Sequence, residues 1–389
     1  MRMNDSVRVG GVIAAIVIVS LAVPRVCAVP PDPDNAALLY YQAFLSLAEL
    51  SDEGRELIAD VARGESEPND AVRQYLHKCQ GGIEFAEAAA QVPSCQWGLR
   101  FSQGYEMLMP HLAHTRLLVY VLVADARVRA ADGNYRGALE RCLMTETLAR
   151  HVGDETLVSY LVSISVRAVG YRCMEDLIGQ TGDDAKLLEW LEAEMATPVG
   201  RTLSPIQPLQ TEIDVFTDVL RMENIETLAR VLGETDAKTR ERITAAANEE
   251  TLARARQLYV ERVTQARSIL ASPRPYEQAF AKLEALTEFA DPNDPAAVSV
   301  AAFMPAIGPI FNLTIRIEAH ANAIKTAVAI CLEKARSGQL PRNLPADAPK
   351  DPYSGQAFEY ERTDRGFVLR CRAKELRTDR LHEYVFELR

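Results

Sequence analysis

Residues 117–124 read LLVYVLVA, and this stretch decides the fold. It is apolar on every side of a helix, so the helix that carries it must be surrounded by other helices. It belongs to a helical pattern over residues 110–178 that breaks only at 132–134 (DGN) and 153–154 (GD). Short breaks between long helices make neighbouring helices antiparallel. The pattern predicts a mainly α protein of stacked antiparallel hairpins, similar to a tetratricopeptide-repeat (TPR) or α-solenoid bundle.

The rest of the chain extends this pattern and then changes. The helix over residues 155–178 has a predicted core stripe of Leu157, Leu161, Ile164, Ala168, Tyr171 and Met174. Alternating apolar residues near 358–360, 367–372 and 384–388 predict a small C-terminal antiparallel β-meander. We therefore expect a targeting segment (1–28), a helical hairpin region with one TPR-like unit (29–200), a long-helix region (201–337) and the meander (338–389).

The N-terminus has the pattern of an export signal. Arg2 and Arg8 precede an uncharged apolar run at residues 9–23, and Val26-Cys27-Ala28 places small residues before a cleavage point. As a helix the run would span about 22 Å, short of the roughly 30 Å hydrocarbon core. A cleaved signal peptide is the first interpretation, an uncleaved membrane anchor the second, and a lipid anchor on Cys27 the third. All three predict an exported protein at the periplasm or cell surface, whose contact with a membrane is limited to this segment if it is uncleaved.

Charge and missing motifs limit the function. The chain has 43 Lys and Arg against 54 Asp and Glu, a net charge of −11. This deficit of cations argues against a nucleic-acid partner. The sequence has no Walker A, G-x-G-x-x-G, G-x-S-x-G or HExxH motif, so it predicts no catalytic residue and no cofactor.

His111 and His114 are the candidate metal ligands. At spacing i, i+3, both imidazoles can share one helix face and occupy two corners of a metal site. A metal-dependent hydrolase would also need a third ligand and a general base. The alternative is structural, with His111 in the first helical turn and His114 packed between helices.

Cysteine spacing permits a disulfide. Six cysteines would remain after cleavage, and Cys79 and Cys95 flank a passage from helix to loop that a bridge could close. Cys142 and Cys173 are predicted to be offset by about 13 Å along the axes of antiparallel helices, which is too far for a disulfide bridge. Buried free thiols are the alternative for all six.

Two regions carry a resemblance. Pro93-x-Cys95-x-Trp97, followed by residues 110–116 (PHLAHTR) and 149–166 (ARHVGDETLVSYLVSISV), resembles a family of exported helical proteins of planctomycete-type bacteria. Residues 338–370 are similar to a tail in that family and, more loosely, to the end of type II secretion pseudopilins. The resemblance implies an envelope location and a mostly helical fold, and no activity comes with it.

These observations favour a non-catalytic function. We expect an exported helical scaffold or protein-binding module whose groove holds a peptide or another envelope protein. A metal-dependent hydrolase using His111 and His114 is the first alternative. An accessory component of a secretion or pilus-like system is the second.

Cleavage of the signal can be measured directly. The intact mass of protein purified from an envelope fraction should correspond to a chain that begins at Val29. A mass that still includes residues 1–28 would contradict cleavage and favour the anchor.

Overall fold

The computed structural model describes residues 31–224, 247–289 and 294–388, together with 228, 237, 241, 245 and 291. Asp34–Arg389 makes one compact unit. The predicted export segment, with its apolar run at 9–23, lies outside the described residues.

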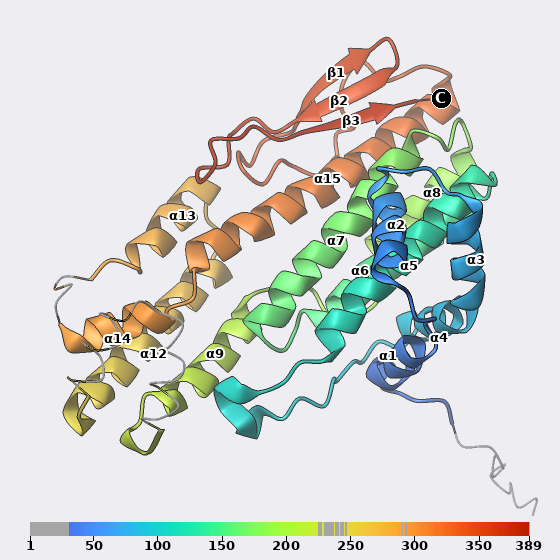
Figure 1. Cartoon of the computed structure of the whole chain (residues 1–389). Coiled ribbons are helices and arrows are strands. Elements are labelled where there is room, and N and C mark those ends of the chain that lie inside the picture. The colour runs from blue at the N-terminus through green and yellow to red at the C-terminus, as the bar shows by residue number, and fades with distance from the viewer. Residues whose placement is uncertain are drawn as a thin grey trace, which may run out of the picture. The chain divides into compact units, whose positions relative to one another are not determined.

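Helices make up most of this unit (Figure 1). The N-terminal helices are α1 (Ala36–Leu45), α2 (Asp52–Arg63), α3 (Asp70–Lys78), α4 (Gln80–Ala90) and the 3-10 helix η1 (Phe101–Glu106). The central helices are α5 (His111–Ala131), α6 (Tyr135–Val152), α7 (Leu157–Ile178) and α8 (Ala185–Ala196). The remaining ones are α9 (Ile206–Val219), η2 (Met222–Asn224), α12 (Glu249–Ala271), α13 (Tyr276–Ala285), α14 (Pro295–Phe303) and α15 (Ile307–Ser337).

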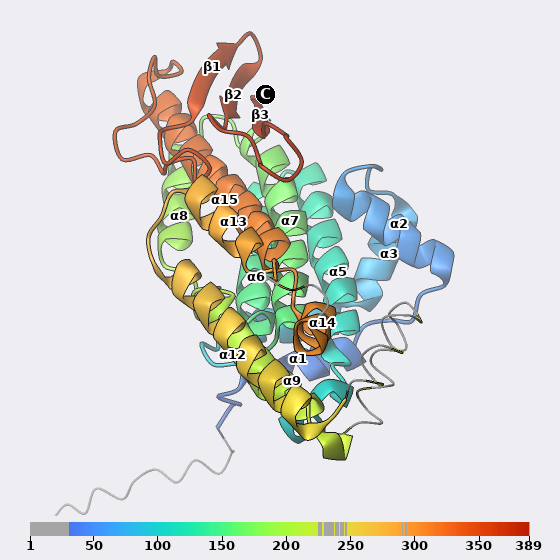
Figure 2. The ribbon, with the colours of Figure 1, turned by 90° about the vertical axis from the view of Figure 1, so that its left-hand side faces the viewer.

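The helices of the central block are direct neighbours. α5, α6 and α7 contact one another, and α7 also contacts α15 (Figures 1 and 2). The predicted breaks are the turns between them. The Asn134 side chain accepts a hydrogen bond from the Gly137 amide at 2.9 Å, and Thr156 forms a capping box with Ser159 at the start of α7. These side chains satisfy amides that have no partner inside the helix, and so define where each helix starts.

The predicted core stripe of α7 is only partly correct. Leu157, Ile164, Tyr171 and Met174 are buried, but Leu161 is 36% exposed and Ala168 is also exposed. The reason is that α7 has neighbours on several sides, including α2, α5, α6, α9 and α15. Its buried surface is therefore wide, and the one uncovered strip passes through Leu161 and Ala168.

A small sheet closes the chain. Strands β1 (Glu359–Thr363), β2 (Gly366–Arg370) and β3 (Glu383–Glu387) are antiparallel in the order β1-β2-β3, with Leu369 paired to Tyr360 on one side and Tyr384 on the other. β3 contacts α7 and α15, and Phe367 and Phe386 are buried. The predicted fold class, mainly α with a C-terminal antiparallel meander, is confirmed.

One described segment, Pro295–Ser337, is long and apolar enough to cross a membrane by length and composition. It comprises α14 and α15, separated at Met304 where the backbone is extended. α15 packs on α7, α8 and α13 and buries many of its apolar side chains there. Packing inside the protein accounts for its composition.

Close packing of α6 on α7 can be tested at Gly170, where a β-carbon would overlap the Thr145 side chain. We expect Gly170→Ala to lower the free energy of unfolding by about 1–3 kcal/mol, because overpacking moves the helices apart. Gly81→Ala, also in a helix, is the matched control, since the nearest atom to its β-carbon would be 4.0 Å away. It should raise the free energy by up to about 1 kcal/mol. Equal effects in chemical denaturation would contradict the close approach.

Candidate functional site

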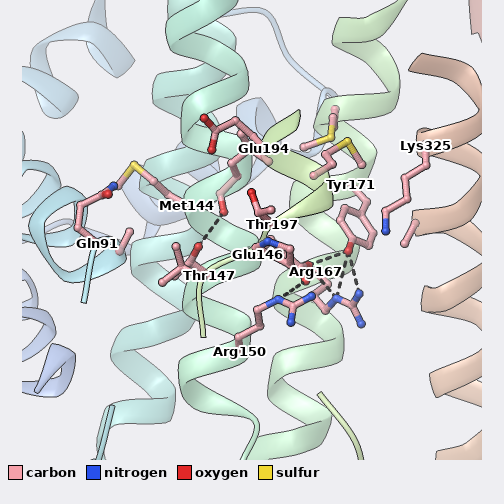
Figure 3. A pocket seen from close by; sticks show the side chains of 17 residues that line it. Gln91, Met144, Glu146, Thr147, Arg150, Arg167, Tyr171, Glu194, Thr197 and Lys325 are labelled. Atoms are coloured by element: carbon pink, nitrogen blue, oxygen red, sulfur yellow. Dashed lines mark hydrogen bonds and ion pairs between the residues drawn. The ribbon is translucent and has the colours of Figure 1, made fainter. Parts of the chain in front are cut away.

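A pocket of about 160 Å³ opens between α6, α7, α8 and α15 (Figure 3). The connector after α8 and the end of α4 complete its wall. Its charged and aromatic lining consists of Glu146 and Arg150 from α6, Arg167 and Tyr171 from α7, Glu194 from α8 and Lys325 from α15.

Glu146 lies at the centre of a hydrogen-bond cluster in this pocket. Its Oε1 accepts from Arg150 Nε at 2.9 Å, and its Oε2 accepts from Arg167 Nε at 2.8 Å and from the Tyr171 hydroxyl at 2.7 Å. Helical spacing supplies the pairs, because Glu146 and Arg150, like Arg167 and Tyr171, are four residues apart. The side chains of Glu146, Arg150 and Arg167 are only 11–15% exposed. We call these four residues the Glu146 cluster.

The environment favours the protonated forms of Tyr171 and Arg167. Burial and then the neighbouring Glu146 raise the pKa of Tyr171 above its ordinary value, so its hydroxyl stays protonated and donates. Burial opposes the charge on Arg167, but Tyr171 and Glu146 outweigh it and raise the pKa of Arg167. Two largely buried guanidinium groups share the carboxylate of Glu146.

Cations outnumber carboxylates in the lining. Arg150, Arg167 and Lys325 face Glu146 and Glu194, which is three charges against two. Glu194 is at the exposed rim, where it accepts from Trp190 Nε1 at 3.0 Å. Another acid, Glu318, lies outside the lining and interacts electrostatically with Arg167 and Lys325. Burial raises the pKa of Glu318, which favours its neutral form.

Methionines give the pocket an adaptable apolar wall. Met144, Met174 and Met195 come from α6, α7 and α8. An unbranched thioether side chain can change shape to fit different apolar groups. Chemically, the pocket is suited to an anionic group attached to an apolar body.

The predicted metal ligands lie elsewhere, against aromatic rings. His111 stacks on Trp97 with ring centroids 4.5 Å apart, and His114 stacks on Phe44 at 5.4 Å. Burial lowers the pKa of His111 to about 4, and neither of its ring nitrogens has a hydrogen-bond partner among the described residues. Among the residues that the structure describes, no group of three or more His, Cys, Asp or Glu side chains could hold a metal ion. None of these residues therefore supplies a third ligand to His111 and His114.

The cysteines of the described residues are free thiols, including the predicted pair Cys79 and Cys95. Cys79 is buried at the junction of α3 and α4, and burial raises the pKa of the Cys95 thiol. A raised pKa keeps a thiol protonated and unreactive.

Cys142 and Cys173, in contrast, are closer than predicted. A hydrogen bond with Cys173, and then burial, raises the pKa of the Cys142 thiol. Part of the difference arises because α6 ends at Val152 and α7 begins at Leu157, so the residues between them add no helical rise. Counting helical residues alone reduces the expected offset from about 13 Å to about 9 Å.

No sequence motif indicates the Glu146 cluster. Lys325, which also lines the pocket, is distant from the cluster in sequence. One signal was available: Arg167 is the only charged residue between positions 156 and 171. A lone charge in an apolar helix needs a buried partner, which here is Glu146.

Comparison with known proteins adds no relative, because no protein-family model, curated protein or solved structure matches this chain.

The buried, neutral His111 makes stability depend on pH. Its pKa is about 4 in the folded protein and about 6.5 in an unfolded chain, so the unfolded state binds the proton more tightly. Stability is therefore lost as the pH falls from 6.5 toward 4. When the pH is lowered from 7 to 5, the free energy of unfolding should fall in both proteins. The fall should be about 2 kcal/mol smaller in His111→Phe than in the wild type. Denaturant titrations measure this difference, and parallel losses would contradict a neutral buried His111.

Proposed function

We propose that this protein is a non-catalytic, exported helical scaffold that binds a peptide segment of another envelope protein. The pocket beside the Glu146 cluster takes one carboxylate of that segment, from an Asp or Glu side chain or from a C-terminus. An exported location is supported by the apolar run at residues 9–23 and the small residues that follow it.

Unused guanidinium nitrogens carry the proposal. Nη1 of Arg167 and Nη2 of Arg150 have no hydrogen-bond partner within the part of the chain that the structure describes. The Nε of each arginine is bonded to Glu146, so both groups are already oriented. Guanidinium donors held in place bind carboxylates well because little side-chain freedom is lost on binding.

The rest of the lining supports a peptide as the carrier of the carboxylate. Lys325, on α15, is exposed and has no ion pair among the described residues. The methionine wall accepts apolar side chains of varied shape. The pocket is about large enough for one side chain, so the remainder of a peptide would lie along the surrounding helices.

Selection from a random peptide library tests this function. Peptides enriched on the wild-type protein should carry an acidic residue or a free C-terminus beside apolar residues. Lys325→Glu should weaken their binding about tenfold or more, because it reverses one charge of the pocket.

Lys282→Glu is the matched control, since Lys282 is an exposed helical lysine on α13 outside the pocket. It should bind the selected peptides as the wild type does. Enrichment without acidic groups, or equal losses in both variants, would overturn the proposed site.

A further inference from the structure

A second groove runs along the uncovered strip of α7. The strip consists of Val158, Leu161, Ser165, Ala168 and Arg172, spaced by 3, 4, 3 and 4 residues. Val158 is 50% exposed, although it is apolar. This spacing keeps one face of the helix in line over four turns.

Between this strip, α15 and the C-terminal sheet, the surface is hollowed by about 500 Å³. Leu161, Ile164 and Ala168 of α7 and Leu313 and Ile317 of α15 form apolar walls. The volume is within the range of small-molecule sites. From Leu161 to Glu175 the groove follows α7 for about 21 Å.

The groove changes from apolar to polar along its length. Tyr160 is bonded to Thr314 near one end, and Glu175 to His320 near the other, so α7 and α15 pass the groove in the same direction. Apolar residues therefore face one another at the first end. The second end gathers Arg172, Glu175 and His320 with four residues of the C-terminal region, Arg380, His382, Glu383 and Tyr384.

The carboxylates at and beneath the polar end have hydrogen-bond or ion-pair partners within the protein. Glu175 bonds His320 Nε2 at 3.0 Å and the Val385 amide at 3.3 Å. Glu383 bonds Arg370 Nε at 3.0 Å. Glu375, fully buried beneath this end, bonds Arg316 and His382.

Two arginines at the polar end are exposed, and one of them has no acidic partner among the described residues. Arg380 lines the groove, is exposed, and has no side-chain hydrogen bond or ion pair among the described residues. Arg172 is 61% exposed and reaches Glu175 and Asp176 only at 3.5 and 3.9 Å. An apolar trough that ends at the unpaired guanidinium of Arg380, beside the exposed Arg172, complements a long chain with an anionic end.

We propose that this groove binds a free long-chain fatty acid. The alkyl chain lies between Leu161, Ala168 and Leu313, and the carboxylate meets Arg172 and Arg380. A carboxylate matches the planar guanidinium fork. The site is separate from the pocket beside the Glu146 cluster, and its ligand does not depend on the peptide function proposed for that pocket.

Binding of saturated fatty acids from ten to sixteen carbons to the purified protein, measured by calorimetry, tests the ligand class. Affinity should rise about fourfold for each added methylene while the chain still fits the groove. The alcohol of the same length should bind about tenfold or more weakly, because it forms no charge-assisted bonds with the arginines. Equal binding of acid and alcohol would overturn the proposal, as would a preference for phospholipid.

Substitutions then locate the site. Ala168→Trp should fill the groove and abolish binding, whereas Ala88→Trp, at an exposed alanine of α4, should not.

Arg172→Gln combined with Arg380→Gln should weaken binding of the acid about tenfold or more and leave binding of the alcohol unchanged. Arg342→Gln, at an exposed arginine before the sheet, is the matched control. Thermal melts identify any variant that fails to fold. Because Arg172 and Arg380 are exposed, we expect the double arginine variant to fold, and it tests the site even if Ala168→Trp does not fold. Wild-type affinity in both Ala168→Trp and the arginine pair would contradict the assignment.

Discussion

Helix α7 packs so closely on α6 that the β-carbon of any other residue at Gly170 would overlap Thr145. This contact places the two helices that carry the Glu146 cluster side by side. Because α5 and α15 also pack on α7, the same helix positions both the pocket and the groove on its uncovered strip. Both candidate sites therefore depend on the packing of α7.

The Glu146 cluster is the electrostatic consequence of that packing. Bringing α6 and α7 together buries Arg150 and Arg167, and desolvation of two guanidinium groups is costly unless an acid is bonded to them. Glu146 supplies that acid, and the Tyr171 hydroxyl adds a neutral donor. One carboxylate cannot fully compensate two cations. The proposed preference of the pocket for an anion rests on the remaining positive charge, even though the whole chain has a net charge of −11.

Local patterns predicted the fold better than the site. The apolar run at 117–124 required surrounding helices, and Leu118 and Leu122 are indeed buried. Short helices with few bulky apolar residues, such as α2, were not predicted; α2 buries Ile58, Val61 and two alanines. Lys325 reaches the pocket from a helix about 160 residues beyond Arg167, and no local pattern indicates that the two lie close together. The exposed Leu161 and Ala168 could not be distinguished from core residues because helical periodicity does not reveal which faces have neighbours.

The central claim is that Arg150 and Arg167 hold a carboxylate that comes from outside the chain. The most direct measurement is the NMR spectrum of the arginine Nε–H groups while N-acetylglutamic acid methylamide is added, with the glutamine analogue as the control. The account predicts saturable shifts of the Arg150 and Arg167 signals with the acid and none with the amide. Signals that stay in place with the acid, or move equally with both compounds, would contradict it.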